Sequence, residues 1–217
     1  MADVTLLGSP NPLDVAADLV REALERVGPG ARLGIPGGSA LEVLARVRAT
    51  MDPSLWRTLK LTWVDERMVP LADAQSNRGS AYRTKALDAD QPVGLELPLV
   101  LDGETPAAAV KRASDVFERE FGGALDVALL GMGEDGHVAS LFPGHEGLNA
   151  TGLVAAIEGS PKPPSQRLTL TLPVLARVGL ARYVVAIGAG KRDAVMRLVA
   201  GDDIPAARLG AVTVVTD

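Results

Sequence analysis

Cysteine is absent from this chain of 217 residues, and aromatic residues are scarce. Without cysteine the protein has no thiol nucleophile, no disulfide framework and no cysteine-based zinc site. Aromatic residues make up only 3% of the chain, whereas hydrophobic residues as a whole make up 47%. The composition therefore predicts a sizeable core that is built mostly from Val, Leu, Ala and Ile.

The chain also lacks an excess of basic residues, and it lacks long apolar runs. Its formal net charge is −5, which argues against a nucleic-acid partner, because a nucleic-acid surface needs clustered positive charge. A few local Arg and Lys residues would still suffice to hold a phosphorylated small molecule. No apolar run approaches the about 20 residues of a membrane span, and no basic segment followed by an apolar one opens the chain. These features predict a soluble, cytoplasmic protein with no membrane partner.

Short apolar runs alternate with longer stretches of helical periodicity along the chain. Strands are predicted at residues 4–7, 32–35, 59–64, 125–130, 167–172, 183–187 and 212–215. Helices are predicted at residues 12–27, 40–49, 80–87, 106–121, 173–178 and 192–199. This alternation indicates an α/β fold with a mostly parallel sheet and helices on both faces. No repeat or long linker divides residues 1–217, so a single domain is predicted, with room for a small added lobe.

The most informative segment runs from Gly131 to Pro143 and reads G-M-G-E-D-G-H-V-A-S-L-F-P. It follows a short apolar run that is typical of a buried strand. Its glycines allow close backbone approach to a ligand, and it carries Asp135 and His137, one of only two histidines in the chain. Open α/β sheets bind their ligands where a strand ends in such a loop. Taken alone, the segment is also compatible with a tight turn and a solvated histidine.

A second glycine-rich turn follows the predicted strand at residues 32–35. Gly37, Gly38 and Ser39 stand where a helix begins, and the free N–H groups of a helix start, together with a serine hydroxyl, suit an anion. Such a turn is more often only a connection. It lacks the lysine of a P-loop, so a nucleoside triphosphate site is not predicted.

Charged residues also stand just after one predicted strand, at the start of another and in the turn that follows a third. Asp65, Glu66 and Arg67 follow a predicted strand at its carboxyl end, which is the favoured edge for ligands in an open sheet. A solvated strand exit is the alternative interpretation. Arg167 opens the alternating run R-L-T-L-T-L, and Lys191 follows a Gly-Ala-Gly turn between a strand and a helix. Single cations at such positions are commonly solvated.

In their order along the chain, these segments resemble the 6-phosphogluconolactonase family of the glucosamine/galactosamine-6-phosphate isomerase superfamily. The resemblance covers nearly the whole chain. It rests on Gly37 to Ser39, Asp65 to Arg67 with Ser76 and Asn77, Gly131 to Pro143, Pro163 to Thr171, and Gly188 to Lys191. The chain departs from the family at Ala40 and Leu41, where Thr-Pro is common, so one hydroxyl contact to phosphate is expected to be missing.

The resemblance implies a Rossmann-like fold and hydrolysis of 6-phospho-D-glucono-1,5-lactone to 6-phospho-D-gluconate in the oxidative pentose phosphate pathway, without metal or other cofactor. It assigns His137 as the general base and places Arg67 near the lactone or its phosphate. Asp135, in the same loop as His137, is expected either to orient the base or to shape the loop. Asp65 is expected to face the sugar hydroxyls, and Arg167 with Lys191 to hold the phosphate. The implied substrate-binding residues are Gly37, Gly38, Ser39, Asp65, Asn77, Arg167 and Lys191.

Two alternatives belong to related proteins. Glucosamine-6-phosphate deaminase, an isomerase, has a similar Asp-Gly-His loop with a catalytic Glu five residues after its His, whereas this chain has Phe142 there, which is neither acid nor base. A non-catalytic sugar-phosphate sensor of a transcription regulator needs a DNA-binding segment, for which this acidic chain has no spare length.

Ser140 shows no nucleophile-elbow pattern. His145, the other histidine, is predicted to be a non-catalytic loop residue near the pocket rim.

Overall fold

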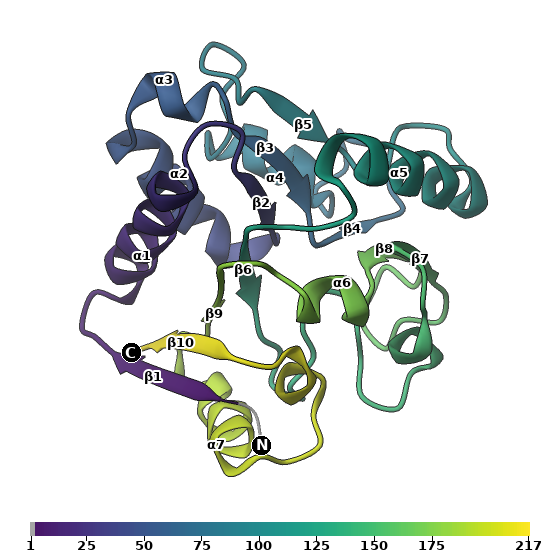
Figure 1. Ribbon diagram of the computed structural model, residues 1–217. Coiled ribbons are helices and arrows are strands. Elements are labelled where there is room, and N and C mark those ends of the chain that lie inside the picture. Colours follow the sequence, from purple (N-terminus) through teal and green to yellow (C-terminus); the bar gives the residue numbers. More distant parts are fainter. Residues whose placement is uncertain (1–2) are drawn as a thin grey trace.

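The computed structural model describes residues 3–217 and shows a central sheet of seven parallel strands (Figure 1). Their order is β1 (Val4–Gly8), β10 (Val212–Thr216), β9 (Ala181–Val185), β6 (Val127–Gly131), β2 (Arg32–Ile35), β3 (Lys60–Trp63) and β5 (Leu95–Leu97). Each neighbouring pair is parallel. The predicted α/β class and parallel sheet are therefore confirmed.

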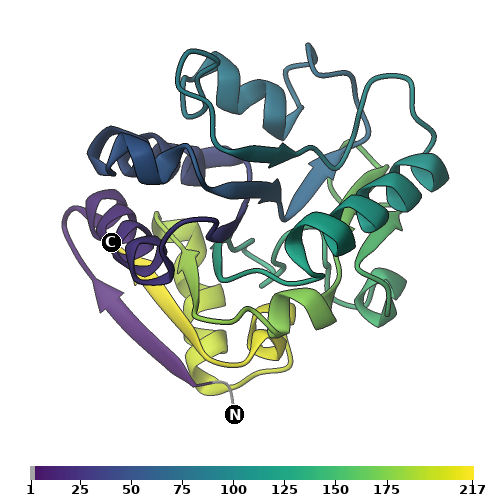
Figure 2. The same ribbon diagram turned by 45° about the horizontal axis from the view of Figure 1, so that its top comes forward.

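Helices surround this sheet (Figure 2). They are α1 (Pro12–Val27), α2 (Leu41–Thr50), α3 (Pro53–Trp56), α4 (Asn77–Arg83), α5 (Pro106–Phe121), α6 (Leu172–Ala176) and α7 (Arg192–Ala200), with short 3₁₀ turns η1 (Gly38–Ala40), η2 (Glu146–Asn149), η3 (Ala189–Lys191) and η4 (Pro205–Leu209). Helix α1 packs on α2 and lies over β6, β9 and β10, whereas α5 packs against β5. No helix within residues 3–217 is both long and apolar enough to cross a membrane.

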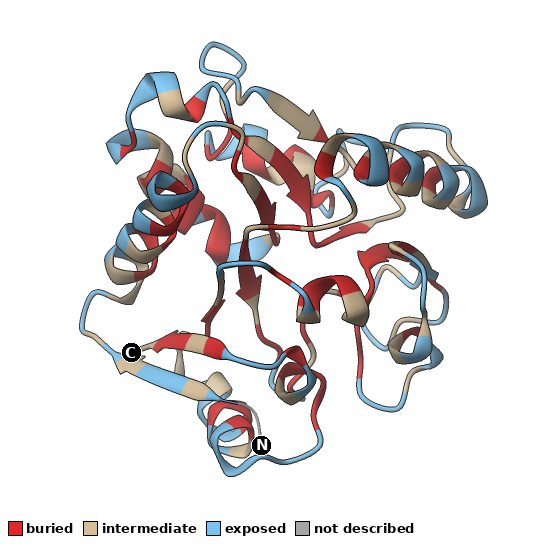
Figure 3. Cartoon of the chain, viewed as in Figure 1, coloured by how far each residue is buried: buried red, intermediate tan, exposed pale blue. Residues whose placement is uncertain are grey.

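The buried residues, which lie along the central strands (Figure 3), are mostly aliphatic, as the composition predicts. All of residues 127–130 in β6 are buried, because a parallel sheet covered on both faces has no solvent side. Two of the few aromatic residues lie near the end of α5, where the rings of Phe117 and Phe121 stack with their centroids 5.2 Å apart. The rigid centre of the sheet holds the loops that follow its strands.

A second sheet of three antiparallel strands stands beside the first. It consists of β4 (Asp65–Arg67), β8 (Arg167–Leu170) and β7 (Val154–Ile157). Arg67 lies directly opposite Arg167 in this ladder, and Asp65 lies opposite Thr169. Directly opposite residues share a face of an antiparallel pair, so Asp65, Arg67 and Arg167 point to the same side. The division of residues 1–217 into one domain with a small lobe stays a prediction.

Several element boundaries differ from the predicted ones. The helix predicted at residues 80–87 is α4, which begins three residues earlier because the Ser76 side chain accepts the Gly79 N–H (2.9 Å) and caps it. It ends before Lys85, whose φ of +56° is not helical. Strands β4, β5 and β7 and helix α3 were not predicted. Each has only three or four residues, too few to establish a periodicity.

Candidate active site

The winding of the chain fixes where a ligand site can form. From β2 the chain proceeds outward to β3 and β5, whereas from β6 it proceeds the other way to β9 and β10. Strands β2 and β6 are neighbours, so the loops that follow them diverge, and ligands bind at such a reversal. A pocket of about 370 Å³ opens there. Nine of the ten predicted site residues line it: Gly37, Gly38, Ser39, Asp65, Arg67, Asn77, His137, Arg167 and Lys191.

The side chain of the tenth predicted residue, Asp135, is hydrogen-bonded to the side chain of His137. The His137 Nδ1 atom lies 2.5 Å from Asp135 Oδ1, and the same carboxylate oxygen accepts the His137 backbone N–H at 3.3 Å. Because a carboxylate is an acceptor, this bond assigns the proton to Nδ1 and leaves Nε2 with a free lone pair. The pair therefore has the form of a general base with its orienting group.

Burial decides the protonation state of this pair. Desolvation lowers the pKa of His137, and the positive charge of Lys162 lowers it further, whereas Asp135 and Asp65 raise it. Burial raises the pKa of Asp135 more than any single interaction lowers it, but the side-chain hydrogen bond, the charge and the backbone N–H of His137, together with the charge of Lys162, hold the pKa below its usual value. The ring of Phe142 packs against the imidazole, with centroids 4.6 Å apart. His137 is thus neutral near pH 7, as a base must be.

The loop after β6 is folded tightly around the pair. The Gly133 N–H donates to the carbonyl of His137 (2.9 Å), and the Gly136 N–H donates to the carbonyl of Gly133 (3.0 Å). A side chain at Gly133 would collide with both the imidazole and the Asp135 carboxylate. Gly136 has a φ of +82°, a backbone conformation that residues other than glycine rarely adopt. These two glycines let the loop bring Asp135 and His137 together.

The wall formed by β4 and α4 is organised by a buried carboxylate. Glu66 accepts the backbone N–H groups of Arg67, Asn77 and Arg78, each at 2.7 Å. Burial raises the pKa of Glu66, although these three bonds lower it. The Asn77 amide nitrogen then donates to the carbonyl of Asp65 (2.9 Å). Glu66 therefore joins the start of α4 to β4 and fixes the side chains that face the pocket.

Arg67 and Arg167 face the pocket from the small sheet, but they are bound differently. Arg67 donates one Nη1 hydrogen bond to the carbonyl of Gln75 (2.6 Å), while its buried Nε has no partner within residues 3–217. Arg167 is 5% exposed, and its Nε and Nη2 donate to three backbone carbonyls, those of Lys162, Pro163 and Pro164. Most donors of Arg167 are thus occupied by the protein itself.

The remaining side of Arg167 belongs to a buried polar cluster. Its Nη1 lies 3.5 Å from Ser140 Oγ and 3.9 Å from Asp65 Oδ2. The Ser140 hydroxyl donates to Asp65 Oδ2 at 2.6 Å, and the guanidinium lies over the Phe142 ring, 5.6 Å from its centroid. Ser140 therefore links two site residues, in agreement with its lack of a nucleophile pattern.

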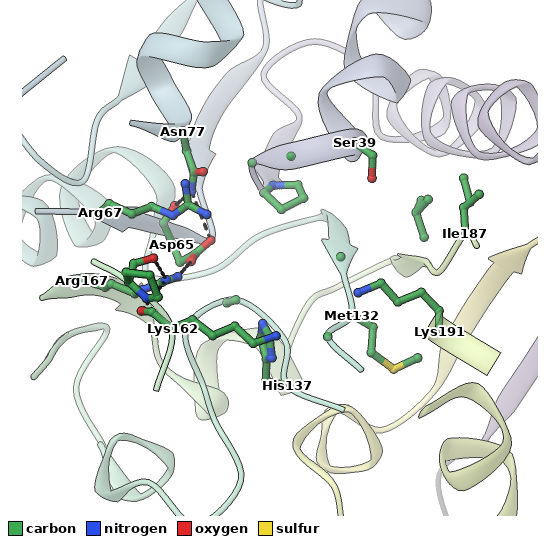
Figure 4. A pocket seen from close by; sticks show the side chains of 18 residues that line it. Ser39, Asp65, Arg67, Asn77, Met132, His137, Lys162, Arg167, Ile187 and Lys191 are labelled. Atoms are coloured by element: carbon green, nitrogen blue, oxygen red, sulfur yellow. Dashed lines mark hydrogen bonds and ion pairs between the residues drawn. The ribbon is translucent and has the colours of Figure 1, made fainter. Parts of the chain in front are cut away.

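Lys191 and Ser39 reach the pocket from the side opposite Arg67 and Arg167 (Figure 4). Lys191 ends the 3₁₀ turn after β9, and Gly38 and Ser39 begin the turn after β2. The Lys191 ammonium makes no ion pair within residues 3–217, so its charge is available to a ligand. Ala40, at the position where the resemblance predicts a threonine, has no hydroxyl to offer a ligand, and it is buried.

Two residues of the site were missed by the sequence reasoning. Lys162 lines the pocket, but in the sequence only its position five residues before Arg167 marked it. Glu66 was marked by its place between Asp65 and Arg67, but nothing in the sequence showed that it faces away from the ligand and toward α4.

His145 has a structural role. Its Nδ1 accepts the Gly147 N–H (3.0 Å) and its Nε2 donates to the carbonyl of Glu158 (2.9 Å). It caps the 3₁₀ turn η2 and is not among the residues that line the pocket. Nowhere within residues 3–217 do three or more His, Asp or Glu side chains gather in a way that would hold a metal ion.

Comparison with known proteins places this chain in a family. The family described as glucosamine-6-phosphate isomerases/6-phosphogluconolactonase matches residues 13–216. The 6-phosphogluconolactonase of Rattus norvegicus is 36% identical over 224 residues, covering 94% of this chain and 85% of the relative. That of Mycobacterium tuberculosis is 35% identical over 189 residues, covering 81% and 75%. The crystal structure of the Thermotoga maritima 6-phosphogluconolactonase has a TM-score of 0.81 at 26% identity over 100% of both chains. This chain therefore belongs to the family of glucosamine-6-phosphate isomerases and 6-phosphogluconolactonases.

Proposed function

We propose that this protein hydrolyses 6-phospho-D-glucono-1,5-lactone to 6-phospho-D-gluconate. The observation that carries the proposal is the His137–Asp135 pair, which presents a free Nε2 to a pocket with several cations. Such a pocket suits an anionic substrate whose reaction needs a base at neutral pH. The relatives with 35 to 36% identity bear the name of this activity, and their substrate fits both features.

The reaction follows from this geometry. His137 Nε2 takes a proton from a water molecule as the water oxygen bonds to the lactone carbonyl carbon, and the π electrons of the carbonyl move onto its oxygen. Asp135 holds the Nδ1 proton and stabilises the imidazolium. When the oxyanion collapses, the bond to the ring oxygen breaks, and the imidazolium returns its proton to that oxygen. The products are a hydroxyl group and a carboxylic acid, which ionises at neutral pH.

The rest of the pocket positions the substrate. Asp65 and Asn77, which Glu66 and Ser140 hold in place, offer an acceptor and an amide to the sugar hydroxyls. Arg67 also lines the pocket, and we assign its guanidinium to the lactone. A phosphate held away from the reacting carbon fixes the distance between the carbonyl and the base, and such positioning lowers the barrier.

The phosphate is assigned to Lys191, to the turn at Gly37, Gly38 and Ser39, and to Arg167. Lys191 supports this role because its ammonium is unpaired within the described residues and lies on the same side of the pocket as Ser39 (Figure 4). Arg167 lies across the pocket from Lys191, so a phosphate that contacts both must lie between them.

Phe142 weighs against a deaminase reaction. Its buried ring packs on His137 where the deaminase loop carries a catalytic carboxylate, and a phenyl ring transfers no proton. A sensor without catalysis would have no use for an oriented imidazole. The cytoplasmic location and the lack of a nucleic-acid partner stay predictions from the sequence.

The activity is tested by following acid release from 6-phospho-D-glucono-1,5-lactone above its spontaneous hydrolysis, with EDTA present. We expect rapid hydrolysis by the wild-type protein and a fall in kcat of ~10² to 10⁴ in His137→Ala, because a general base contributes about that much. His145→Ala is the matched control, since this histidine lies outside the pocket, and it should retain normal activity. Equal losses in both histidine variants, or activity that EDTA abolishes, would contradict the proposal.

The phosphate assignment has a separate test. Lys191→Ala should lower kcat/KM for the phosphorylated lactone by about 1.5 to 3 kcal/mol, the contribution of a charged hydrogen bond. Hydrolysis of D-glucono-1,5-lactone, which has no phosphate, should hardly change. Equal losses on both lactones would remove Lys191 from the phosphate site.

A further inference from the structure

Lys162 is a pocket residue that the mechanism above does not use. It lines the same pocket as His137, and its side chain extends across the pocket toward the imidazole (Figure 4). Its ammonium makes no ion pair or hydrogen bond within residues 3–217. An unpaired ammonium at a catalytic base is available for an anion that arrives with the substrate or forms during the reaction.

The backbone of Lys162 is held in place, although its side chain is exposed. Its carbonyl accepts a hydrogen bond from Arg167 Nη2 (2.9 Å) and another from Ser160 Oγ (2.8 Å), which also accepts the Lys162 N–H (3.3 Å). Arg167 also binds the carbonyls of Pro163 and Pro164. A buried arginine therefore clamps the loop of residues 158–166 between β7 and β8.

The charge of Lys162 is unfavourable for one half of the reaction. When His137 takes a proton it becomes a cation, and a neighbouring ammonium opposes this. The charged groups that act on His137 are Asp135 and Asp65, which raise its pKa, and Lys162, which lowers it; the packed Phe142 ring carries no charge. Lys162 therefore benefits the reaction only where negative charge develops in the transition state.

We propose that Lys162 is a catalytic residue that stabilises the oxyanion formed when water adds to the lactone carbonyl. This rests on the proposed function. As the water oxygen bonds to the carbonyl carbon, its proton goes to His137 Nε2 and the π electron pair goes to the carbonyl oxygen. The new cation then stands next to the Asp135 carboxylate, and the new anion faces the Lys162 ammonium. The two developing charges lie between two fixed charges of opposite sign, which is electrostatic preorganisation.

Another role is open to a cation at this place. Lys162 would instead serve as a ligand of the substrate phosphate if that group lay at the His137 side of the pocket. The two roles differ in their dependence on the substrate, because only an oxyanion role extends to a lactone that has no phosphate. They differ also from plain solvation, which predicts no effect at all.

The test compares Lys162→Met and Lys162→Arg with the wild-type protein on 6-phospho-D-glucono-1,5-lactone and on D-glucono-1,5-lactone. Methionine keeps most of the length of the side chain and removes its charge, and Lys191→Met is the matched control for a pocket lysine. We expect Lys162→Met to lower kcat about 10²- to 10³-fold on both lactones, as for the loss of one oxyanion donor, with KM nearly unchanged. Lys162→Arg should recover part of this loss, and Lys191→Met should affect only the phosphorylated lactone.

The pH profile gives a second readout that a structural role would not change. It is measured on D-glucono-1,5-lactone, because a phosphate group titrates near pH 6 itself. Removing Lys162 removes a charge that lowers the pKa of His137, so the acid limb of kcat/KM should move to higher pH. Thermal melting midpoints check that the variants are folded.

Each outcome is decisive. A loss confined to the phosphorylated lactone would make Lys162 a phosphate ligand and overturn the proposal, and normal kcat with an unmoved acid limb would make it a solvated lysine. Hydrolysis by the wild-type protein with an unaffected Lys162→Met variant would refute the role of Lys162 alone. A wild-type protein that hydrolysed neither lactone would refute the proposed function itself, and the Lys162 role with it.

Discussion

Replacement of Asp135 by asparagine isolates the contribution of one hydrogen bond to catalysis. The bond between Asp135 Oδ1 and His137 Nδ1 is 2.5 Å long and joins a carboxylate to a half-buried imidazole. Asparagine keeps the size of the side chain, removes the charge and allows the amide to donate to Nδ1. That donation would place the imidazole proton on Nε2, the atom that must take a proton from water.

The size of the effect follows from the strength of the bond. A hydrogen bond to a charged group contributes about 1.5 to 3 kcal/mol, and each 1.36 kcal/mol is a factor of ten in rate. Loss of the bond alone should therefore lower kcat roughly 10- to 150-fold. A reversed tautomer adds to this loss, so ~10-fold is the lower bound.

The same variant makes a signed prediction for pH dependence. His137 is active when neutral, so kcat/KM rises with pH through its pKa, and burial places this acid limb below about pH 6.5. Asp135 raises the pKa of His137. Asp135→Asn should therefore shift the acid limb to still lower pH while the plateau falls.

The assay is initial-rate hydrolysis of D-glucono-1,5-lactone between pH 5 and 8, corrected for the spontaneous rate. Glu134→Gln is the matched control, because Glu134 is the exposed neighbour of Asp135 and does not line the pocket. An acid limb that moved to higher pH, or a plateau equal to that of the control, would refute the pairing of Asp135 with the base.

Three further predictions concern the scaffold. Gly133→Ala should lower kcat strongly because its methyl group would displace the catalytic pair; wild-type turnover in steady-state kinetics would contradict this close contact. Glu66→Ala should lower the free energy of unfolding by at least ~3 kcal/mol in urea titration, since one buried and two part-buried N–H groups lose their acceptor. A loss below ~1 kcal/mol would show that water replaces the carboxylate. Arg167→Ala should lower the melting temperature because three carbonyls lose their donors, whereas Lys191→Ala should leave it unchanged; equal melting temperatures would contradict the clamp.

The parts of the site that could be predicted are those that the chain specifies locally. Asp135 and His137 are two residues apart, and the glycines that fold their loop lie in the same segment, so the sequence contained the whole unit. The same holds for the turn at Gly37 to Ser39, which follows a clear strand and precedes a clear helix. Periodicity also located the long helices α1 and α5 with their observed bounds.

The parts that could not be predicted depend on pairing between distant segments. Arg67 and Arg167 are register partners across 100 positions of sequence, and no local pattern of a three-residue strand specifies such a partner. The inward direction of Glu66 depends on α4 packing above it, and the direction of Lys162 depends on a clamp from Arg167. Side-chain direction in these short elements is a tertiary property.

The pairing of β4 with β8 also limits how the length of the chain can vary. Side chains alternate between the faces of a strand, so a slip of one residue in register turns every side chain of that strand to the other face. A single-residue deletion within β8 (Arg167–Leu170) would point Arg167 away from the pocket and release the loop that carries Lys162 at the same time. The connection between Ile157 and Arg167 therefore cannot lose or gain a residue at its Arg167 end without changing the register of β8. Its exposed tip is held mainly by the hydrogen bonds that the Lys162 carbonyl accepts from Ser160 and Arg167. Natural length variation in this part of the family should accordingly be concentrated before Ser160 and be absent from the strand itself.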